Sequence, residues 1–138
     1  MSIIQTQTTS FKKELYEAVH NLSTDTIYIA LYTGDANLNA DTTAYSATNE
    51  VVASGYTAGG EALTGVAISS SGYTAYVNWA NVSWTAAITA RCALIYNVTQ
   101  GNKSIAVIDF GADKTSTTTF TITMPANTST TALIRSSN

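Results

Sequence analysis

The first part of the chain carries one hydrophobic pattern with the period of an α-helix. Four apolar residues recur three or four positions apart, with charged side chains between them. These apolar positions are Phe11, Leu15, Val19 and Leu22. A hydroxyl at Thr9 or Ser10 can cap the start by accepting a backbone N–H. The pattern predicts a helix of about three turns over residues 10–21 that buries one face.

After residue 25 the apolar positions alternate instead. Ile27, Ile29 and Leu31 alternate with more polar or smaller neighbours, which predicts a half-buried strand over residues 26–32. Residues 34–49 are rich in turn-forming residues and predict a long surface loop.

Seven further segments have the alternation or the short apolar run of a strand. They are residues 50–54, 61–68, 73–79, 86–96, 104–110, 120–124 and 131–135. The run at 86–96 is long and apolar, which predicts a central strand covered on both sides, whereas 131–135 is expected at an edge. Seven or eight short strands after a single helix predict a mainly β fold, either an antiparallel β-sandwich or a small jelly-roll or barrel-like domain.

The length of 138 residues indicates one domain. Residues 1–9 are polar except for Met1, Ile3 and Ile4, and we expect them to form a flexible N-terminal arm. Residues 10–138 then make a single β-rich domain, with the helix at about 10–21 and strands from about residue 26 onward.

Composition narrows the possible chemistry. Serine and threonine make up more than a quarter of the chain, only 11% of residues are charged, and the net charge is −3. The basic residues are scattered, so no stripe neutralises a run of phosphates and nucleic-acid binding is not expected. They are Lys12, Lys13, Arg91, Lys103, Lys114 and Arg135. No segment has the roughly 18 apolar residues of a membrane span, and the N-terminus lacks a secretory pattern, so synthesis and folding in the cytoplasm are expected.

Three features could carry chemistry but have simpler explanations. His20 lies at the predicted helix end, where a lone histidine is more often a cap or surface residue than a catalyst. Cys92 interrupts an apolar run and is expected to be a buried hydrophobe. The segment GYTAGGEALTG contains no phosphate-binding motif, so Gly55, Gly59 and Gly60 are expected to permit positive φ in tight crossings.

Charged residues suggest two further hypotheses. Asp35, Asp41 and Glu50 lack the spacing of a calcium loop and are expected to be solvated loop carboxylates. Arg91 and Asp109 each interrupt an apolar strand, and the two strands are consecutive. We expect a cross-strand ion pair that fixes register; the alternative is that Arg91 faces a neighbouring subunit.

The aromatic residues fit either a core or a recognition surface. Tyr73 and Trp79 share one face of a predicted strand, which favours the core for both. Four other tyrosines are the better candidates for an exposed, interfacial or carbohydrate-binding surface. These are Tyr28, Tyr32, Tyr45 and Tyr56. Trp84 fits either role.

Several stretches, taken in order, resemble a family of small structural proteins of tailed bacteriophages. They are SFKKELYEAVHNL, TIYIALYTGDANLNADTTAYSATNEV, GYTAGGEALTG, VSWTAAITARCALIYNVTQGNKSIAVIDFGADK and FTITMP. The resemblance covers residues 10–135, and its most specific pieces are GYTAGG and the WTxxxITARxALIYN run. Cys92 stands in this run where small residues are usual.

The resemblance implies a virion component without enzymatic activity, and most specifically a capsid decoration (cement) protein on the outer face of the shell. A tail, neck or fibre-associated protein, or a receptor- or glycan-binding module of the particle, is the alternative. The implied partners are the major capsid protein or other virion proteins, with possible self-association. The family brings no catalytic, cofactor-binding or metal-binding residues to this chain. We also expect the arm at residues 1–9 to order against a neighbour in the particle.

Overall fold

The computed structural model describes residues 2–137, which contain one short helix and ten strands. The elements are β1 (Thr6–Gln7), α1 (Thr9–Tyr16), β2 (Ile27–Tyr32), β3 (Glu61–Ala62), β4 (Ala67–Ser71), β5 (Thr74–Asn78), β6 (Val82–Trp84), β7 (Thr89–Asn97), β8 (Lys103–Thr115), β9 (Phe120–Ile122) and β10 (Ile134–Ser136). They form a five-stranded sheet in the order β1-β8-β7-β2-β3, a three-stranded sheet β10-β5-β4 and a two-stranded ribbon β6-β9. Every strand pairing is antiparallel.

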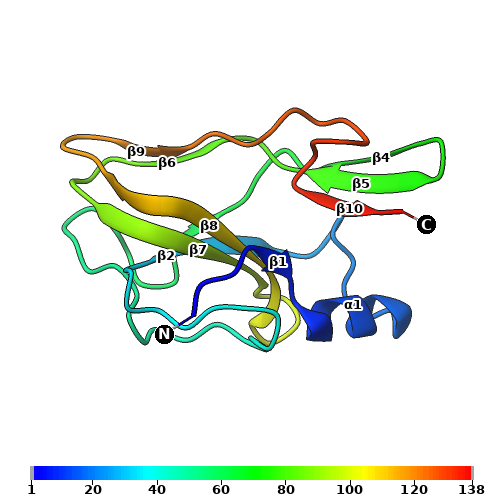
Figure 1. The fold of residues 1–138 in the computed structure, drawn as a ribbon, viewed down its shortest axis with the longest axis horizontal. Helices are drawn as coiled ribbons and strands as arrows, with labels where there is room; N and C mark the ends of the chain where they lie inside the picture. The colour runs from blue at the N-terminus through cyan, green and yellow to red at the C-terminus, as the bar shows by residue number, and fades with distance from the viewer. Residues whose placement is uncertain (1, 138) are drawn as a thin grey trace.

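The sheets lie in two layers, which confirms the mainly β, sandwich-like fold with one N-terminal helix. Figure 1 shows the two-stranded β6-β9 pair and the three-stranded sheet next to each other above the five-stranded sheet, with α1 at one end. The main core contains residues of both layers, including Ile29 and Ile95 from the large sheet and Val77, Trp84 and Phe120 from the small ones. The two layers are therefore held together by a shared hydrophobic interior.

The outer face of the five-stranded sheet is also buried. Tyr32, Leu94 and Val107 form a second cluster there with Leu38 of the long loop and Ile3 near the N-terminus. The half-buried strand expected at 26–32 is thus wrong in one respect, because β2 is covered on both faces. The loop predicted at 34–49 is present and supplies part of this cover.

The N-terminal segment belongs to this cover. Ile4 N–H donates to the Leu38 carbonyl at 3.0 Å, and the Leu38 N–H donates to the Ser2 carbonyl at 2.8 Å. β1 then pairs with β8, with Thr6 opposite Val107. The flexible arm expected at residues 1–9 is therefore corrected for residues 2–9, which are hydrogen-bonded to the body; Met1 lies outside the described residues.

The helix is shorter than predicted and starts one residue earlier. Thr8, rather than Thr9 or Ser10, is the N-cap, and its hydroxyl accepts from the Phe11 N–H. α1 ends at Tyr16 because the chain reverses at Ala18, whose φ is 58°. The apolar period continues to Leu22, but the backbone does not follow it as a helix.

Two predicted strands around the glycine-rich segment differ from the structure. Residues 50–54 make only an isolated bridge between Tyr32 and Glu50 before the chain turns. The segment 61–68 is split into β3 and β4, because residues 63–66 cross from the large sheet to the small one. Gly60 (φ 86°) lies just before β3, and a Cβ there would overlap the Ile29 carbonyl.

The remaining strands agree in existence and differ mainly in length. The central strand predicted at 86–96 is β7, buried along most of its length. β8 extends to Thr115, beyond the predicted end at residue 110, and its final part is exposed. β10 lies at a sheet edge as expected, whereas β1 and β6 were not predicted. Both are too short to show a hydrophobic period.

Candidate functional site: an apolar groove beside the helix

A groove of about 700 Å³ lies between α1 and the β10-β5-β4 sheet. Apolar side chains line it from both walls. They are Leu15, Tyr16 and Leu22 from the helix side, and Ile68, Val77 and Ile134 from the sheet side. We call this space the helix–sheet groove.

The sheet wall owes its apolar character to strand register. Ile68 of β4 and Ile134 of β10 are both paired with Val77 of β5. Residues directly opposite each other in antiparallel strands project from the same face, so the three side chains form one row across the sheet. Val77 and Ile134 are buried, but Ile68 is 54% exposed. The row is therefore only partly covered by the chain itself.

The helix wall is equally incomplete. α1 packs against β8 and buries Phe11 there, while Leu15 and Tyr16 remain 41% and 93% exposed. The helical period correctly placed Leu15 on an apolar face. The β10-β5-β4 sheet that this face is turned toward lies on the other side of an open groove and does not cover Leu15. An apolar surface of this kind, unfilled by its own fold, is typical of a contact site.

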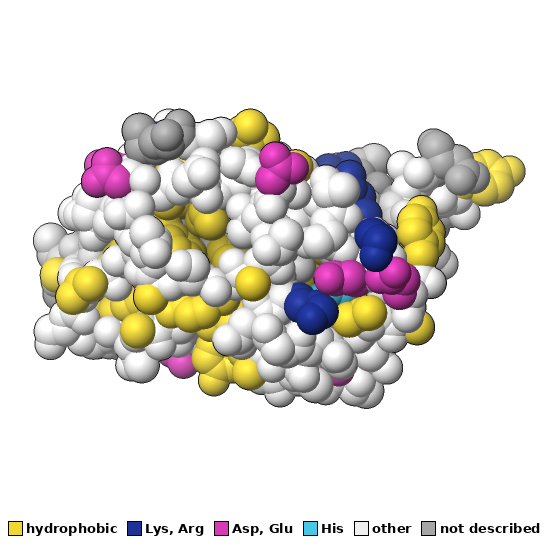
Figure 2. Space-filling view, turned by 90° about the horizontal axis from the view of Figure 1, so that it is seen from below, with side chains coloured by type: hydrophobic (Ala, Val, Ile, Leu, Met, Phe, Trp, Pro, Cys, Tyr) yellow, Lys and Arg dark blue, Asp and Glu magenta, His cyan; other side chains and the backbone are white. Residues whose placement is uncertain are grey.

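Charged side chains stand next to the groove. Lys12 and Arg135 are among its lining residues, and Lys13 forms an exposed ion pair with Glu17 at 2.8 Å. Figure 2 shows the molecule from below the view of Figure 1, and the basic side chains in view lie toward the α1 end, close to acidic and hydrophobic ones. The exposed ion pair contributes little to stability, since solvent and salt screen it.

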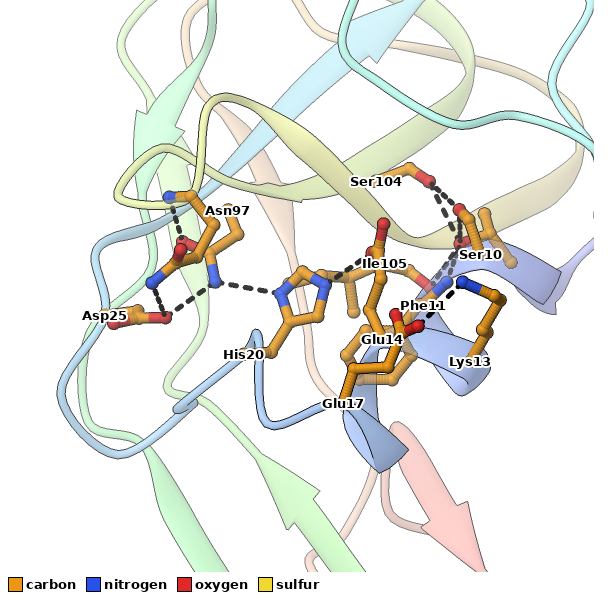
Figure 3. Close-up of polar contacts among 12 residues, drawn as sticks. Ser10, Phe11, Lys13, Glu14, Glu17, His20, Asp25, Asn97, Ser104 and Ile105 are labelled. Carbon is orange, nitrogen blue, oxygen red and sulfur yellow. Dashed lines mark hydrogen bonds and ion pairs between the residues drawn. The ribbon is translucent and has the colours of Figure 1, made fainter.

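His20 lies in the segment that follows α1, and its side chain belongs to a network of side-chain hydrogen bonds (Figure 3). Its Nε2 is 2.8 Å from Glu14 Oε1, and Asn97 Nδ2 donates to its Nδ1 at 3.0 Å. Because the Asn97 amide can only donate at Nδ2, Nδ1 accepts, and the proton on Nε2 is donated to Glu14. The His20 side chain is fully buried. The expectation of a helix cap or surface residue is therefore wrong.

Asp25 completes the network on the other side of Asn97. Its Oδ2 accepts from Asn97 Nδ2, from Gln100 Nε2 and from the Asn21 N–H at 2.9–3.3 Å. Loss of solvent raises the pKa of Asp25, but these hydrogen bonds outweigh it and hold the pKa below its ordinary value. The network joins the turn after α1 to the start of β2 and the end of β7.

Glu50 is the centre of a second polar cluster, and it is not the solvated loop residue that we expected. Its Oε1 accepts from Tyr45 at 2.6 Å, and its Oε2 accepts from Tyr56 at 2.5 Å and from the Gly59 N–H at 2.8 Å. Tyr56 in turn accepts from the buried Leu31 N–H at 2.9 Å. The side chain of Glu50 thus fastens the glycine-rich segment to β2.

The tyrosines expected on an exposed surface are largely in this interior. Tyr32 and Tyr56 are buried, whereas Tyr28 and Tyr45 are half-buried. Burial, together with its hydrogen bond to Glu50, raises the pKa of Tyr56, so its hydroxyl stays protonated and can donate. Tyr96, stacked on Tyr45, donates to the Gly59 carbonyl, and burial raises its pKa to about 12.

The other aromatic predictions have different outcomes. Trp79 is buried as expected, and Trp84 packs in the core between Tyr56 and Phe120. Tyr73 is 89% exposed at the β4–β5 turn, so its predicted place in the core is wrong. The alternation of the strand does not reach it, since β5 begins at the next residue.

The predicted ion pair between Arg91 and Asp109 is present. Arg91 Nη2 lies 3.2 Å from Asp109 Oδ1, and the two strands shift register at Arg91. The neighbouring Cys92 is buried, and desolvation raises the pKa of its thiol to about 11. Cys92 therefore acts as a small core side chain, as expected.

The glycine-rich segment and the acidic loop residues can also be placed. Gly55, Gly59 and Gly60 all have positive φ, as predicted. Asp35 and Asp41 do not join Glu50 in a cluster: within residues 2–137 no group of three or more His, Cys, Asp or Glu side chains is arranged to hold a metal ion.

In the same part of the chain, no helix has the length and apolar character needed to cross a bilayer.

Sequence reasoning missed the helix–sheet groove, because its two walls come from segments that are far apart in the sequence. It also missed the role of Asn97 beside His20. One signal was available for that residue, since a polar amide at the end of an apolar strand needs buried partners.

No protein family, curated protein or solved structure matches this chain in the three comparisons.

Proposed function

We propose that this chain is a structural protein of a bacteriophage particle, and most specifically a capsid decoration protein on the outer face of the shell. It would act by binding the major capsid protein or other virion proteins, without a cofactor and without changing a bond in a substrate. The sequence resemblance over residues 10–135 supports this class of protein. The observation that carries the proposal is the helix–sheet groove, with Leu15, Tyr16 and Ile68 exposed around it.

The physical character of the surface suits permanent assembly. Only 11% of residues are charged, so few ions lose their hydration when a large contact forms. Exposed aromatic and aliphatic side chains beside a hollow are the usual anchors of a protein–protein contact.

The body behind the groove suits the same role. The five-stranded sheet has a hydrophobic cluster on each face, and the side chains of His20 and Glu50, in segments next to this sheet, are engaged in internal hydrogen bonds. A body packed on both faces changes little on binding, so less conformational entropy is lost in the contact.

The experiment is a binding assay on purified shells that lack this protein. Wild type is expected to bind, whereas Leu15→Glu and Ile68→Glu are expected to bind about tenfold more weakly or worse, because each places a charge in the apolar contact. Val52→Glu is the matched control, since Val52 is 97% exposed and does not line the groove. Equal thermal unfolding of all variants shows that folding is intact.

Two outcomes would contradict the proposal. Failure of wild type to bind any shell or particle would contradict the proposal that the chain is a virion structural protein. Binding by the groove variants that equals wild type would show that the groove is not the contact site. Binding to tails or necks but not to shells, with few copies per particle, would favour the tail- or neck-associated alternative. Binding to host cells or polysaccharide would favour the receptor- or glycan-binding alternative.

A further inference from the structure

The buried hydrogen-bond network of His20 is connected so that its members depend on one another. Its centre is Asn97, at the end of β7, which lies between His20 and Asp25 (Figure 3). The amide nitrogen of Asn97 donates to His20 Nδ1 at 3.0 Å and to Asp25 Oδ2 at 2.9 Å. Its oxygen, Oδ1, accepts from the Gln100 N–H at 3.2 Å. Both ends of the amide are therefore occupied.

These partners fix the orientation of the Asn97 side chain. A carboxylate accepts and a backbone N–H donates, so Asp25 requires the nitrogen of the amide and Gln100 requires its oxygen. Asn97 is fully buried, and a hydrogen bond lost there is not readily replaced by one to solvent. In this orientation His20 faces an N–H of Asn97. The imidazole must therefore present a nitrogen without a proton, which requires the neutral ring.

Charged and titratable groups surround the imidazole on the elements packed against it. They are Glu14, Lys12 and Tyr16 of α1, Asp25 before β2, Tyr76 of β5, Lys103 of β8 and Arg135 of β10. The carboxylates attract a proton added to the ring, and the cations repel it. Glu14 accepts from Nε2 at 2.8 Å in either charge state of the ring. Only Asn97 changes from a partner to an obstacle, because it presents a donor to the nitrogen that takes up the proton.

We propose that His20 and Asn97 form an acid-sensitive switch that holds the segment between α1 and β2 against the end of β7. A proton taken from solvent by His20 Nδ1 places two donors opposite each other. The Asn97 amide then turns, so that its oxygen accepts from the imidazolium. The same turn removes a donor from Asp25 and the acceptor of the Gln100 N–H.

The segment depends on these side chains for its attachment. It has no helix or strand between Tyr16 and Ile27. Within residues 2–137, every hydrogen bond from residues 17–25 to β7 or to the turn after it runs through the side chain of His20 or Asp25. Protonation of the imidazole therefore loosens the whole connection.

The switch acts on one end of the helix–sheet groove. Four residues of the segment line this groove. They are Ala18, His20, Asn21 and Leu22. When the segment is released from β7, the wall that these residues form is no longer held in place, so the shape of the groove becomes dependent on pH.

The test is an NMR titration of the whole purified protein. It uses no particle and does not depend on the proposed function. The ring nitrogens of His20 report its protonation, and the Asn97 side-chain amide and the Gln100 N–H report the turn. We expect the three signals to change with one midpoint, at a pH above that of acid unfolding. Protection of the Gln100 N–H from hydrogen exchange, corrected for the pH dependence of the exchange reaction, should fall by about tenfold or more across this midpoint.

Two variants separate His20 from its neighbouring carboxylate. His20→Gln has no ring to protonate, so the signals of Asn97 and Gln100 are expected to stay constant over the same pH range. Glu14→Gln is the matched control, because it keeps an oxygen that accepts from Nε2 but removes the charge. It is expected to keep the response. If His20→Gln does not fold, the comparison of midpoints in wild type decides.

Four results would overturn the inference. In wild type they are an imidazole that takes up no proton before the protein unfolds, and Asn97 and Gln100 signals whose midpoint differs from that of the ring. In the variants they are an unchanged pH response in His20→Gln and a lost response in Glu14→Gln.

Discussion

The five-stranded and three-stranded sheets differ in how completely the chain covers them. In β7 the residues from Cys92 to Asn97 are all buried, whereas in β4 the four residues after Ala67 are all exposed. The large sheet has the second layer on one face and the N-terminal segment and long loop on the other. The small sheet has an open groove beside one face. The comparison indicates that the large sheet stabilises the fold and the small sheet is free to make contacts.

The largest expected contrast uses one glycine from each region. Gly60→Ala should lower the free energy of unfolding by more than about 4 kcal/mol, because its Cβ would overlap the backbone of Ile29 in β2. Gly72→Ala, at the β4–β5 turn, should cost only about 1–2 kcal/mol, because φ is 60° but no atom lies within 4 Å of the added Cβ. Urea unfolding measures the free energy of unfolding of both variants. Equal losses in the two variants would contradict the difference between the two regions.

A matched pair of isoleucines tests packing directly. Ile29→Ala removes a fully buried side chain from β2 and should cost about 2–5 kcal/mol through lost burial and a cavity. Ile68→Ala in β4 should cost less than about 1 kcal/mol, because half of its side chain is already exposed. Chemical denaturation with both variants checks this, and a cost at Ile68 as large as that at Ile29 would mean that the small sheet also carries the fold.

A pair of tyrosines tests the buried polar cluster. Tyr56→Phe removes the acceptor of the Leu31 N–H and a donor to Glu50, and should cost about 1–3 kcal/mol. Tyr73→Phe, on the exposed β4–β5 turn, should stay within about 0.5 kcal/mol of wild type. Thermal unfolding distinguishes them, and no loss in Tyr56→Phe would show that the cluster does not stabilise the glycine-rich segment.

The smallest expected effect depends on pH. The pKa of Asp25 is lower in the folded state than its ordinary value of 3.8, so its contribution to stability is present above that value and is lost as the pH falls below it. Asp25→Asn should therefore destabilise the protein at pH 7 and by a smaller amount at pH 3. The free energies of unfolding of both proteins at the two pH values measure this.

Asp113→Asn is the control for the pH experiment. Asp113 is exposed at the end of β8. This substitution should leave stability unchanged at both pH values, and an Asp25→Asn loss that is the same at pH 3 and pH 7 would contradict the assignment.

The sequence predicts the elements whose pattern is long and local. The alternation of Ile27, Ile29 and Leu31 placed β2, and the apolar run at 86–96 placed β7, because each pattern extends over several residues. The ion pair of Arg91 and Asp109 was also predictable, since a charge in a buried strand needs a partner.

Features made by distant segments could not be predicted. Glu50 looked like a solvated loop residue, because nothing local shows that Tyr45 and Tyr56 turn inward to meet it. The end of α1 was placed too late, because the period of Val19 and Leu22 continues past the residue where the backbone reverses. Leu15 was correctly assigned to an apolar face, but the sequence cannot show that the facing sheet leaves a groove.

The proposed virion role is tested most directly by imaging bacteriophage particles assembled in the presence of this chain, at a resolution that would show the chain and its neighbours. The account predicts many copies on the outer face of the shell, with the helix–sheet groove and the β10-β5-β4 sheet against a neighbouring virion protein and the outer cover of the five-stranded sheet away from it. A particle without the chain, or a bound chain whose groove faces solvent, would contradict the account.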